Sequence, residues 1–79
     1  MYTSSYCPYC ANAERLLSEK GINIIQKIPV DQDPKELEKM IKKTGKRTVP
    51  QIFIGELHIG GFDELRASDL SGELDKILA

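Results

Sequence analysis

The sequence has no tryptophan, only one histidine and only two cysteines among its 79 residues. It also has no apolar run close to the roughly 18 residues that a membrane-spanning helix needs. Its 11 basic and 12 acidic residues give a net charge of −1, so no excess of positive charge favours nucleic acid or an anionic membrane. We therefore expect neither nucleic acid nor a membrane among the partners of this protein.

The small number of metal-ligating side chains argues against a structural metal site. Zinc in such sites has four ligands, and the cysteine and histidine side chains of the sequence are only Cys7, Cys10 and His58. A purely structural disulfide is also disfavoured, because it would close a very short loop and remove little entropy from the unfolded chain. The Cys7-Pro8-Tyr9-Cys10 segment therefore favours reversible thiol–disulfide exchange over both alternatives.

The spacing of the two cysteines predicts how their sulfur atoms lie on a helix. A helix that begins at Pro8 places Cys7 at its N-cap and Cys10 one turn inside, close enough for a disulfide. Unpaired N–H groups and the helix dipole at such an end lower the pKa of a cysteine thiol from about 8.5 toward roughly 3.5–7.5. We predict that Cys7 is the nucleophile and that Cys10, turned toward the protein, is the resolving thiol.

Length and composition indicate one small globular domain that spans residues 1–79, with 41% apolar residues. Two cysteines without a visible leader fit a reducing compartment. We expect the cytoplasm, or an organelle if a targeting segment upstream of this sequence was removed.

Hydrophobic periodicity, prolines and glycines predict eight elements in the order β-α-β-α-β-β-α-α. The expected strands are residues 1–3, 22–30, 51–54 and 57–59, and the expected helices are residues 8–20, 34–44, 62–67 and 70–78. Pro29 cannot donate to a β-ladder, so the second strand is expected at an edge. Gly55 and Glu56 predict a two-residue hairpin. The fold class is α/β, a four-stranded mixed sheet flanked by helices, with a short first strand.

Three motifs in this order resemble the glutaredoxin family, and in particular its small dithiol type. They are Tyr2-Thr3 ahead of C-P-Y-C, the segment T-V-P-Q-I-F-I from Thr48, and the segment I-G-G-F-D from Ile59. Together they extend over essentially the whole chain. The resemblance implies the thioredoxin fold and a cis Pro50 that stands opposite the two cysteines.

The resemblance also implies that glutathione is the reducing co-substrate and that no cofactor is bound permanently. The residue before a proline favours an extended backbone, so Val49 can pair with a tripeptide as an added strand. The N–H groups of Phe62 and Asp63 begin a helix and suit a carboxylate, while the Asp63 side chain suits an ammonium group. The implied glutathione-binding residues are Tyr9, Arg47, Thr48, Val49, Pro50, Gly61, Phe62 and Asp63.

Two parts of this assignment have plainer alternatives. Gly60 and Gly61 also suit a simple strand end, and Lys46 and Arg47 also suit a solvated loop, whereas the binding interpretation gives both cations to the glycine carboxylate of glutathione. Ser4 stands where many members of the family have a lysine, which removes one cation close to the first cysteine.

We predict an enzyme, a glutathione-dependent oxidoreductase that reduces protein disulfides and protein–glutathione mixed disulfides through Cys7 and Cys10. One alternative is an electron carrier of the same fold that thioredoxin reductase reduces. Another is an iron–sulfur scaffold, which the proline after Cys7 disfavours by resemblance. Expected partners are glutathione and disulfide-containing or glutathionylated proteins, with ribonucleotide reductase as one candidate, and we expect a monomer without bound metal. His58 is interpreted as a surface residue of the return strand.

Overall fold

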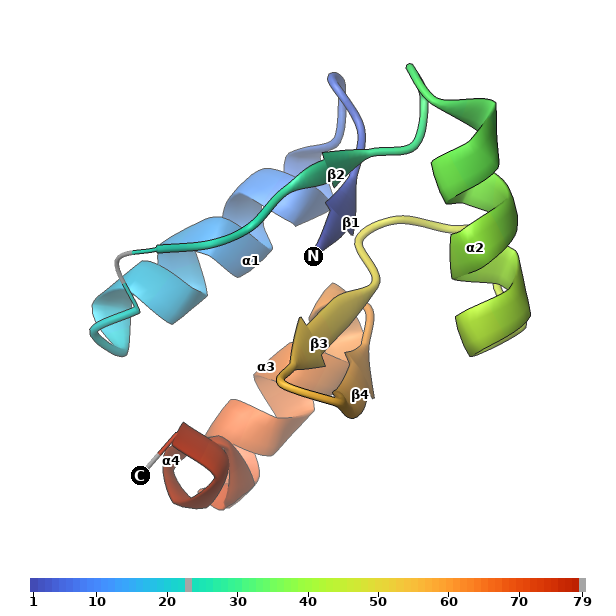
Figure 1. Ribbon diagram of the computed structural model, residues 1–79. Coiled ribbons are helices and arrows are strands. Elements are labelled where there is room, and N and C mark those ends of the chain that lie inside the picture. The colour runs from blue at the N-terminus through green and yellow to red at the C-terminus, as the bar shows by residue number, and fades with distance from the viewer. Residues whose placement is uncertain (23, 79) are drawn as a thin grey trace.

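The computed structural model describes residues 1–22 and 24–78 (Figure 1). Its strands are β1 (Tyr2–Thr3), β2 (Ile28–Pro29), β3 (Ile52–Ile54) and β4 (Leu57–Gly60). Its helices are α1 (Pro8–Glu19), α2 (Pro34–Thr44), α3 (Phe62–Ser71) and α4 (Glu73–Leu78). The element order is the predicted one. No helix among these described residues is long and apolar enough to cross a lipid bilayer.

The four strands form two ladders joined by one bridge, where the sequence predicts a continuous four-stranded sheet. β1 and β2 pair in parallel, and β3 and β4 pair antiparallel across the predicted turn at Gly55 and Glu56. Tyr2 and Gln51 connect the two ladders through backbone hydrogen bonds of 2.9 and 3.2 Å. The strands therefore still form one mixed layer, with β1 between β2 and β3.

β2 is much shorter than the predicted strand at residues 22–30. It pairs with β1, which offers only two residues to the ladder, so the described residues before Ile28 lack a strand partner. Pro29 itself has no N–H for a further ladder bond. The strand prediction was therefore wrong for residues 22, 24–27 and 30, while Asn23 lies outside the described residues.

The boundary between the last two helices also differs from the prediction. α3 continues to Ser71, although the expected break lay between Ala67 and Leu70. The helix ends only at Gly72, whose φ of +86° is left-handed and therefore favours glycine. The predicted boundary was wrong because the polar residues after Ala67 are compatible with helical backbone.

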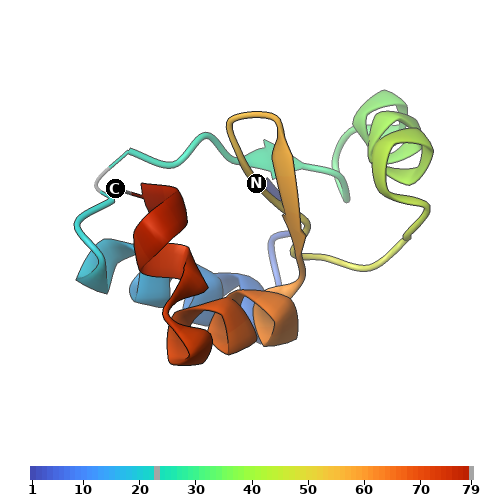
Figure 2. The ribbon, with the colours of Figure 1, turned by 90° about the horizontal axis from the view of Figure 1, so that it is seen from below.

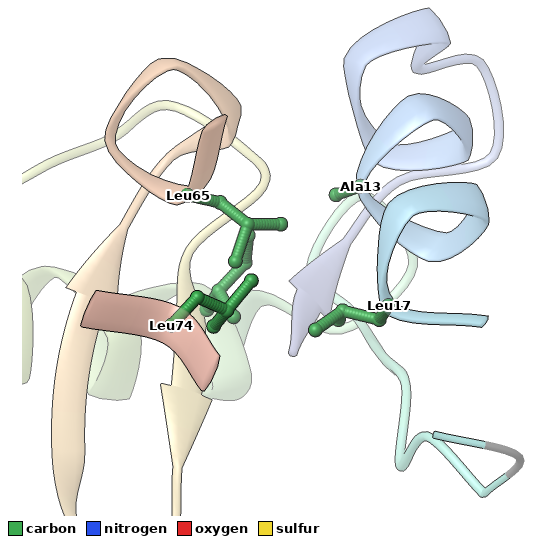
Figure 3. Close-up of a cluster of buried hydrophobic side chains, with 5 residues drawn as sticks. Ala13, Leu17, Leu65 and Leu74 are labelled. Atoms are coloured by element: carbon green, nitrogen blue, oxygen red, sulfur yellow. The ribbon is translucent and has the colours of Figure 1, made fainter. Parts of the chain in front are cut away.

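Helices cover both faces of the strand layer, as Figure 2 shows, with α1, α3 and α4 on one side and α2 on the other. Side chains alternate along β3, so Ile52 and Ile54 pack in one core cluster while Phe53 packs in the other. The larger cluster, seen in Figure 3, buries Ala13, Leu17, Ile52, Leu65 and Leu74. The smaller cluster buries Tyr2, Val30 and Met40.

Lys20, the C-cap residue of α1, forms ion pairs with the C-terminal helices α3 and α4. Its Nζ lies 2.6 Å from Asp69 Oδ1 and 3.0 Å from Asp75 Oδ1. These hydrogen bonds to carboxylates raise the pKa of Lys20. α1 is thus held at its C-terminal end by packing and charge, and its N-terminal end carries Cys7 at the cap and Cys10 in the first turn.

Candidate active site

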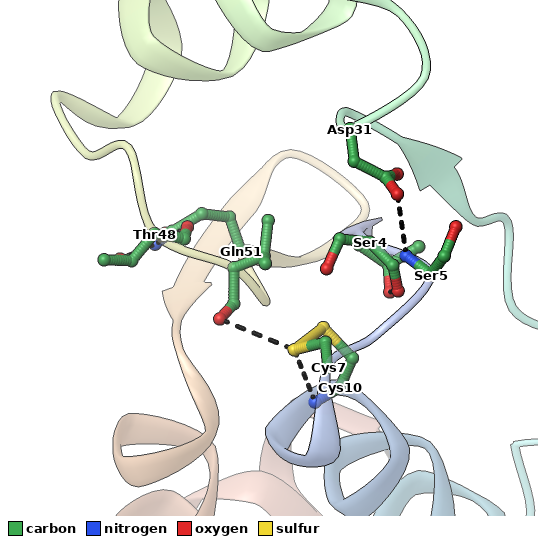
Figure 4. Close-up of a disulfide and its surroundings, with 9 residues drawn as sticks. Ser4, Ser5, Cys7, Cys10, Asp31, Thr48 and Gln51 are labelled. Atoms are coloured by element: carbon green, nitrogen blue, oxygen red, sulfur yellow. Dashed lines mark hydrogen bonds between the residues drawn. A yellow bond between two sulfur atoms is a disulfide. The ribbon is translucent and has the colours of Figure 1, made fainter.

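Cys7 is the N-cap residue of α1. Its backbone is extended (φ −138°, ψ 97°), and Pro8 occupies the first helical position, which the φ of proline suits. The backbone N–H of Cys10 donates to Cys7 Sγ over 3.1 Å. The two cysteines form a disulfide with a Cα–Cα distance of 5.1 Å (Figure 4), so the predicted proximity of the sulfurs is confirmed.

The two cysteines differ in their access to solvent. Cys7 is partly exposed, whereas Cys10 is only 4% exposed and lies inside the protein. A sulfur from another molecule therefore reaches Cys7 first, and Cys10 is placed to attack Cys7 from the protein side. This difference fits the roles predicted from the spacing.

The N-terminus of α1 is an environment that favours a Cys7 thiolate. Its first turn, from Pro8 to Cys10, contains no acidic residue, and the N–H groups at this end have no acceptor within the helix. The carbonyl oxygen of Val49 lies 3.8 Å from Cys7 Sγ on the other side. Because a carbonyl oxygen repels an anion, Val49 does not stabilise a thiolate, whereas the N-terminus of α1 does. The Val49–Pro50 peptide bond is cis, as the resemblance implies.

The loop that leads into Cys7 is held by the connection between β2 and α2. The backbone N–H of Ser5 donates to Asp31 Oδ2 over 3.1 Å (Figure 4). Gln32 Nε2 donates to Ser5 Oγ over 3.0 Å. The hydrogen bond from the Ser5 backbone lowers the pKa of Asp31. A part of the chain distant in sequence thus fixes the backbone two residues before Cys7.

A groove of about 480 Å³ lies between the loop 46–51, whose Val49 contacts Cys7, and the start of α3. This volume falls within the range of roughly 300–1,000 Å³ that is common for small-molecule sites. Arg47, which the resemblance assigned to glutathione, is exposed and does not belong to the lining. The other candidate binding residues are brought together there, namely Tyr9, Lys46, Thr48, Val49, Pro50, Gly61, Phe62 and Asp63.

The two glycines before α3 form a turn that packs closely against the Glu64 side chain. An added Cβ on Gly60 would lie 3.1 Å from Glu64 Cγ, and one on Gly61 would lie 3.5 Å from the Pro50 carbonyl oxygen. Gly60 also has a φ of +115°, which side chains rarely adopt. Glu64 Oε2 accepts from the Gly61 N–H over 3.2 Å and fixes this turn. The first residues of α3, Phe62 and Asp63, line the groove.

The sequence prediction missed several residues of the groove. Gln51 and His58 form part of the lining, together with Ile59 and Glu64. The hairpin register could have indicated His58, because it pairs with Phe53, two residues after Gln51. The neighbouring sequence does not predict that the Gln51 side chain is buried. Its position in the strand predicts only the face of the sheet to which the side chain points.

A second groove is larger, about 780 Å³, and lies beside β3 and the residues before β2. Its lining contains neither cysteine nor any residue of the Thr48–Pro50 loop. This second groove therefore does not adjoin the sulfur atoms of Cys7 and Cys10. Within residues 1–22 and 24–78, no group of three or more His, Cys, Asp and Glu side chains is arranged to hold a metal ion.

Comparison with known proteins agrees with the fold and the cysteine pair. Residues 1–59 match the family model described as Glutaredoxin. The chain is 50% identical to glutaredoxin 3 of Escherichia coli strain K12 over 78 residues, which covers 99% of this chain and 93% of that protein.

Solved structures give the same result. The solution structure of glutaredoxin from Brucella melitensis has a TM-score of 0.83 and 43% identity, over 98% of this chain and 83% of that one. The buckwheat glutaredoxin–glutathione complex has a TM-score of 0.88 and 34% identity, over 98% of this chain and 72% of that one. These likenesses confirm the predicted thioredoxin-like fold. The chain belongs to the glutaredoxin family, with the Cys7–Cys10 pair of a thiol–disulfide oxidoreductase.

Proposed function

We propose that this protein is a glutathione-dependent thiol–disulfide oxidoreductase that reduces protein disulfides and protein–glutathione mixed disulfides. The observation that carries the proposal is the groove whose wall, Val49, contacts Cys7 Sγ at 3.8 Å. The similarity to the buckwheat protein, whose structure is a complex with glutathione, supports the choice of tripeptide.

The charges around the groove suit the groups of glutathione. The N-terminus of α3, which begins at Phe62, is suited to the γ-glutamyl carboxylate, and the Asp63 side chain to the ammonium group. Lys46 lines the groove and is suited to the glycine carboxylate. Tyr9 and Phe62, whose ring centroids are 6.2 Å apart, form an apolar wall. We assign the backbone of Val49 to pairing with the cysteine residue of the tripeptide.

The reaction with a glutathionylated protein proceeds by two exchanges. The Cys7 thiolate attacks the glutathione sulfur of the mixed disulfide, forms a Cys7–glutathione disulfide and releases the protein thiolate, which takes up a proton. A second glutathione thiolate then attacks the glutathione sulfur of this intermediate. Oxidised glutathione leaves and the Cys7 thiolate is regenerated, so one free glutathione is consumed for each protein thiol released.

Reduction of a protein disulfide uses both cysteines. Cys7 forms a mixed disulfide with the substrate, Cys10 attacks Cys7 Sγ, and the substrate leaves as a dithiol. The product is the Cys7–Cys10 disulfide seen in the structure, and two glutathione molecules return it to the dithiol form. We propose that this cycle runs in a monomer in the reducing cytoplasm, with disulfide-containing or glutathionylated proteins as substrates.

The test combines the pH dependence of Cys7 alkylation by iodoacetamide with turnover driven by glutathione. We expect the alkylation rate to rise well below the pKa of about 8.5 of an ordinary thiol, because the α1 N-terminus stabilises the thiolate. We also expect saturable turnover with glutathione, and slower reduction by thioredoxin reductase. Ordinary thiol reactivity together with preferential reduction by thioredoxin reductase would contradict the proposal.

A further inference from the structure

Gln51 is a buried polar residue at the junction of the two β-ladders. It is 3% exposed and is the one polar side chain that is buried among the described residues. Its backbone exchanges two hydrogen bonds with Tyr2 of β1, the strand that leads into the Cys7 loop. A buried amide is costly unless its hydrogen bonds are made, so its partners show what it does.

The side chain of Gln51 holds the loop that faces the nucleophile. Gln51 Nε2 donates to the carbonyl oxygen of Thr48 over 3.0 Å and to Thr48 Oγ1 over 3.3 Å. Thr48 precedes Val49, whose carbonyl oxygen lies 3.8 Å from Cys7 Sγ. The amide therefore connects the core to the segment that stands opposite the reacting sulfur.

His58 fixes the orientation of this amide. Because Gln51 Nε2 donates to Thr48, Gln51 Oε1 must accept, and its partner is His58 Nε2 at 2.8 Å. His58 Nε2 therefore carries a proton. The imidazole is stacked on the ring of Phe53, with centroids 4.8 Å apart and an interplanar angle of 27°. Phe53 in turn is partly buried against the smaller core cluster. The exposed imidazole is therefore held by this stacking and by its hydrogen bond to Gln51.

We propose that Gln51 and His58 are a pair of positioning residues that set the affinity of the groove by fixing the Thr48–Pro50 loop against Cys7. Both residues line the groove, but neither touches the reacting sulfurs, and we assign their effect to the hold on Thr48. The pair controls how well the loop is shaped before the tripeptide pairs with it, so its loss raises KM and leaves the chemical step unchanged. This inference rests on the proposed use of glutathione.

Two substitutions of His58 separate its hydrogen bond from its packing. His58→Phe keeps an aromatic ring to stack on Phe53 but removes the donor to Gln51. His58→Gln removes the ring but places an amide N–H close to the position of Nε2. Because one hydrogen bond of this kind is worth a factor of about two to ten, we expect His58→Phe to raise KM for a glutathione mixed disulfide by that factor. We expect His58→Gln to stay within about twofold of the parent.

A third substitution removes the whole set of contacts. In Gln51→Leu the new side chain is similar in size to glutamine but makes no hydrogen bonds to Thr48 or His58. We expect KM to rise by about tenfold or more. In all folded variants kcat and the rate of Cys7 alkylation should match the parent, because the N-terminus of α1 is untouched. If Gln51→Leu does not fold, the comparison of the two His58 variants decides.

Hydrogen exchange of the Gln51 backbone amide, which donates to the Tyr2 carbonyl oxygen over 3.2 Å, gives a readout that does not depend on glutathione. Faster exchange in His58→Phe than in His58→Gln, at equal melting temperature, supports the positioning role even if the parent does not turn over with glutathione, an outcome that refutes only the proposed function. Equal KM and equal exchange in parent and His58→Phe would overturn the inference. So would a parallel fall of kcat, alkylation rate and melting temperature, since that result indicates a general structural role.

Discussion

The N-termini of α1 and α2 have nearly the same local structure. The N-cap residue Cys7 has φ −138° and ψ 97°, and the N-cap residue Asp33 has φ −137° and ψ 100°, and a proline follows each. Each cap side chain accepts a backbone N–H over 3.1 Å, Cys7 Sγ from Cys10 and Asp33 Oδ1 from Lys35. In both places the local sequence gives a capped helix that begins at a proline.

The two N-termini differ in charge and in what lies opposite. The first turn of α2 contains Glu36, whereas the first turn of α1, residues 8–10, contains no acidic residue. Val49 of a distant loop lies against Cys7 Sγ, and the Ser5 backbone before it is held by Asp31. An N-cap is thus a common stabilising device, and it becomes a reactive centre when the cap atom is a sulfur and a binding loop faces it.

The largest expected effect comes from giving α1 the cap of α2. Cys7→Asp keeps a cap acceptor for the helix, so we expect the melting temperature to stay close to that of the Cys10→Ser protein, which also lacks the disulfide. Thiol–disulfide turnover should fall to the uncatalysed rate, because a carboxylate cannot form a mixed disulfide. Cys7→Ser serves as a second control with a neutral cap. Measurable turnover by either variant would refute the assignment of Cys7 as the nucleophile.

The next effect separates the two cysteines. Cys10→Ser leaves Cys7 at its cap position but removes the thiol that attacks from the protein side. We expect reduction of a protein disulfide to fall by at least about tenfold, while removal of glutathione from a glutathionylated protein stays within a few-fold of the parent. Both rates are measured with the same glutathione supply. Equal loss of both activities would show that Cys10 has a role beyond resolution.

Asp33→Ala removes the cap of α2 and should affect stability alone. The expected cost is about 1 kcal/mol in the free energy of unfolding, with a range of about 0.5–2 kcal/mol for such caps. Denaturant unfolding measures this cost, and Asp33→Asn is the matched control because it keeps a cap acceptor. Activity per folded molecule should be unchanged, since this N-terminus does not face the groove. A lower activity at equal folded fraction would show that the N-terminus of α2 also contributes to the reaction, contrary to the comparison between the N-termini of α1 and α2.

The smallest effect concerns the carboxylate that holds the loop before Cys7. The pKa of Asp31 is lowered from 3.8 in the folded protein by the hydrogen bond from Ser5. Its contribution to stability is therefore present above pH 3.8 and is lost as the pH falls through that value to the folded-state pKa.

Asp31→Asn keeps an acceptor for the Ser5 N–H but does not titrate. The melting temperature of the parent should exceed that of Asp31→Asn slightly at neutral pH, and the difference should shrink in the acidic range. A difference that does not change with pH would show that the charge of Asp31 contributes nothing.

Predictions from the sequence were accurate where the residues at the end of a helix themselves mark that end. α2 begins at Pro34 after the Asp33 cap and ends at Thr44 before Gly45, as predicted. They were wrong where the end depends on another segment, as in β2, whose length is limited by its partner β1. For α3 the sequence predicts an end at Ala67, but the helix continues to Ser71 and is capped by Gly72.

The sequence by itself determined the chemistry of the protein, because the reactive atom, its cap position and the proline after it are neighbours along the chain. Only the tertiary structure decided which groups surround that atom. Val49, the start of α3 and the Gln51–His58 pair come from segments more than 40 residues away from Cys7. Periodicity tells which face of a strand a side chain occupies, but hydrogen-bond partners and groove walls depend on how separate elements pack together.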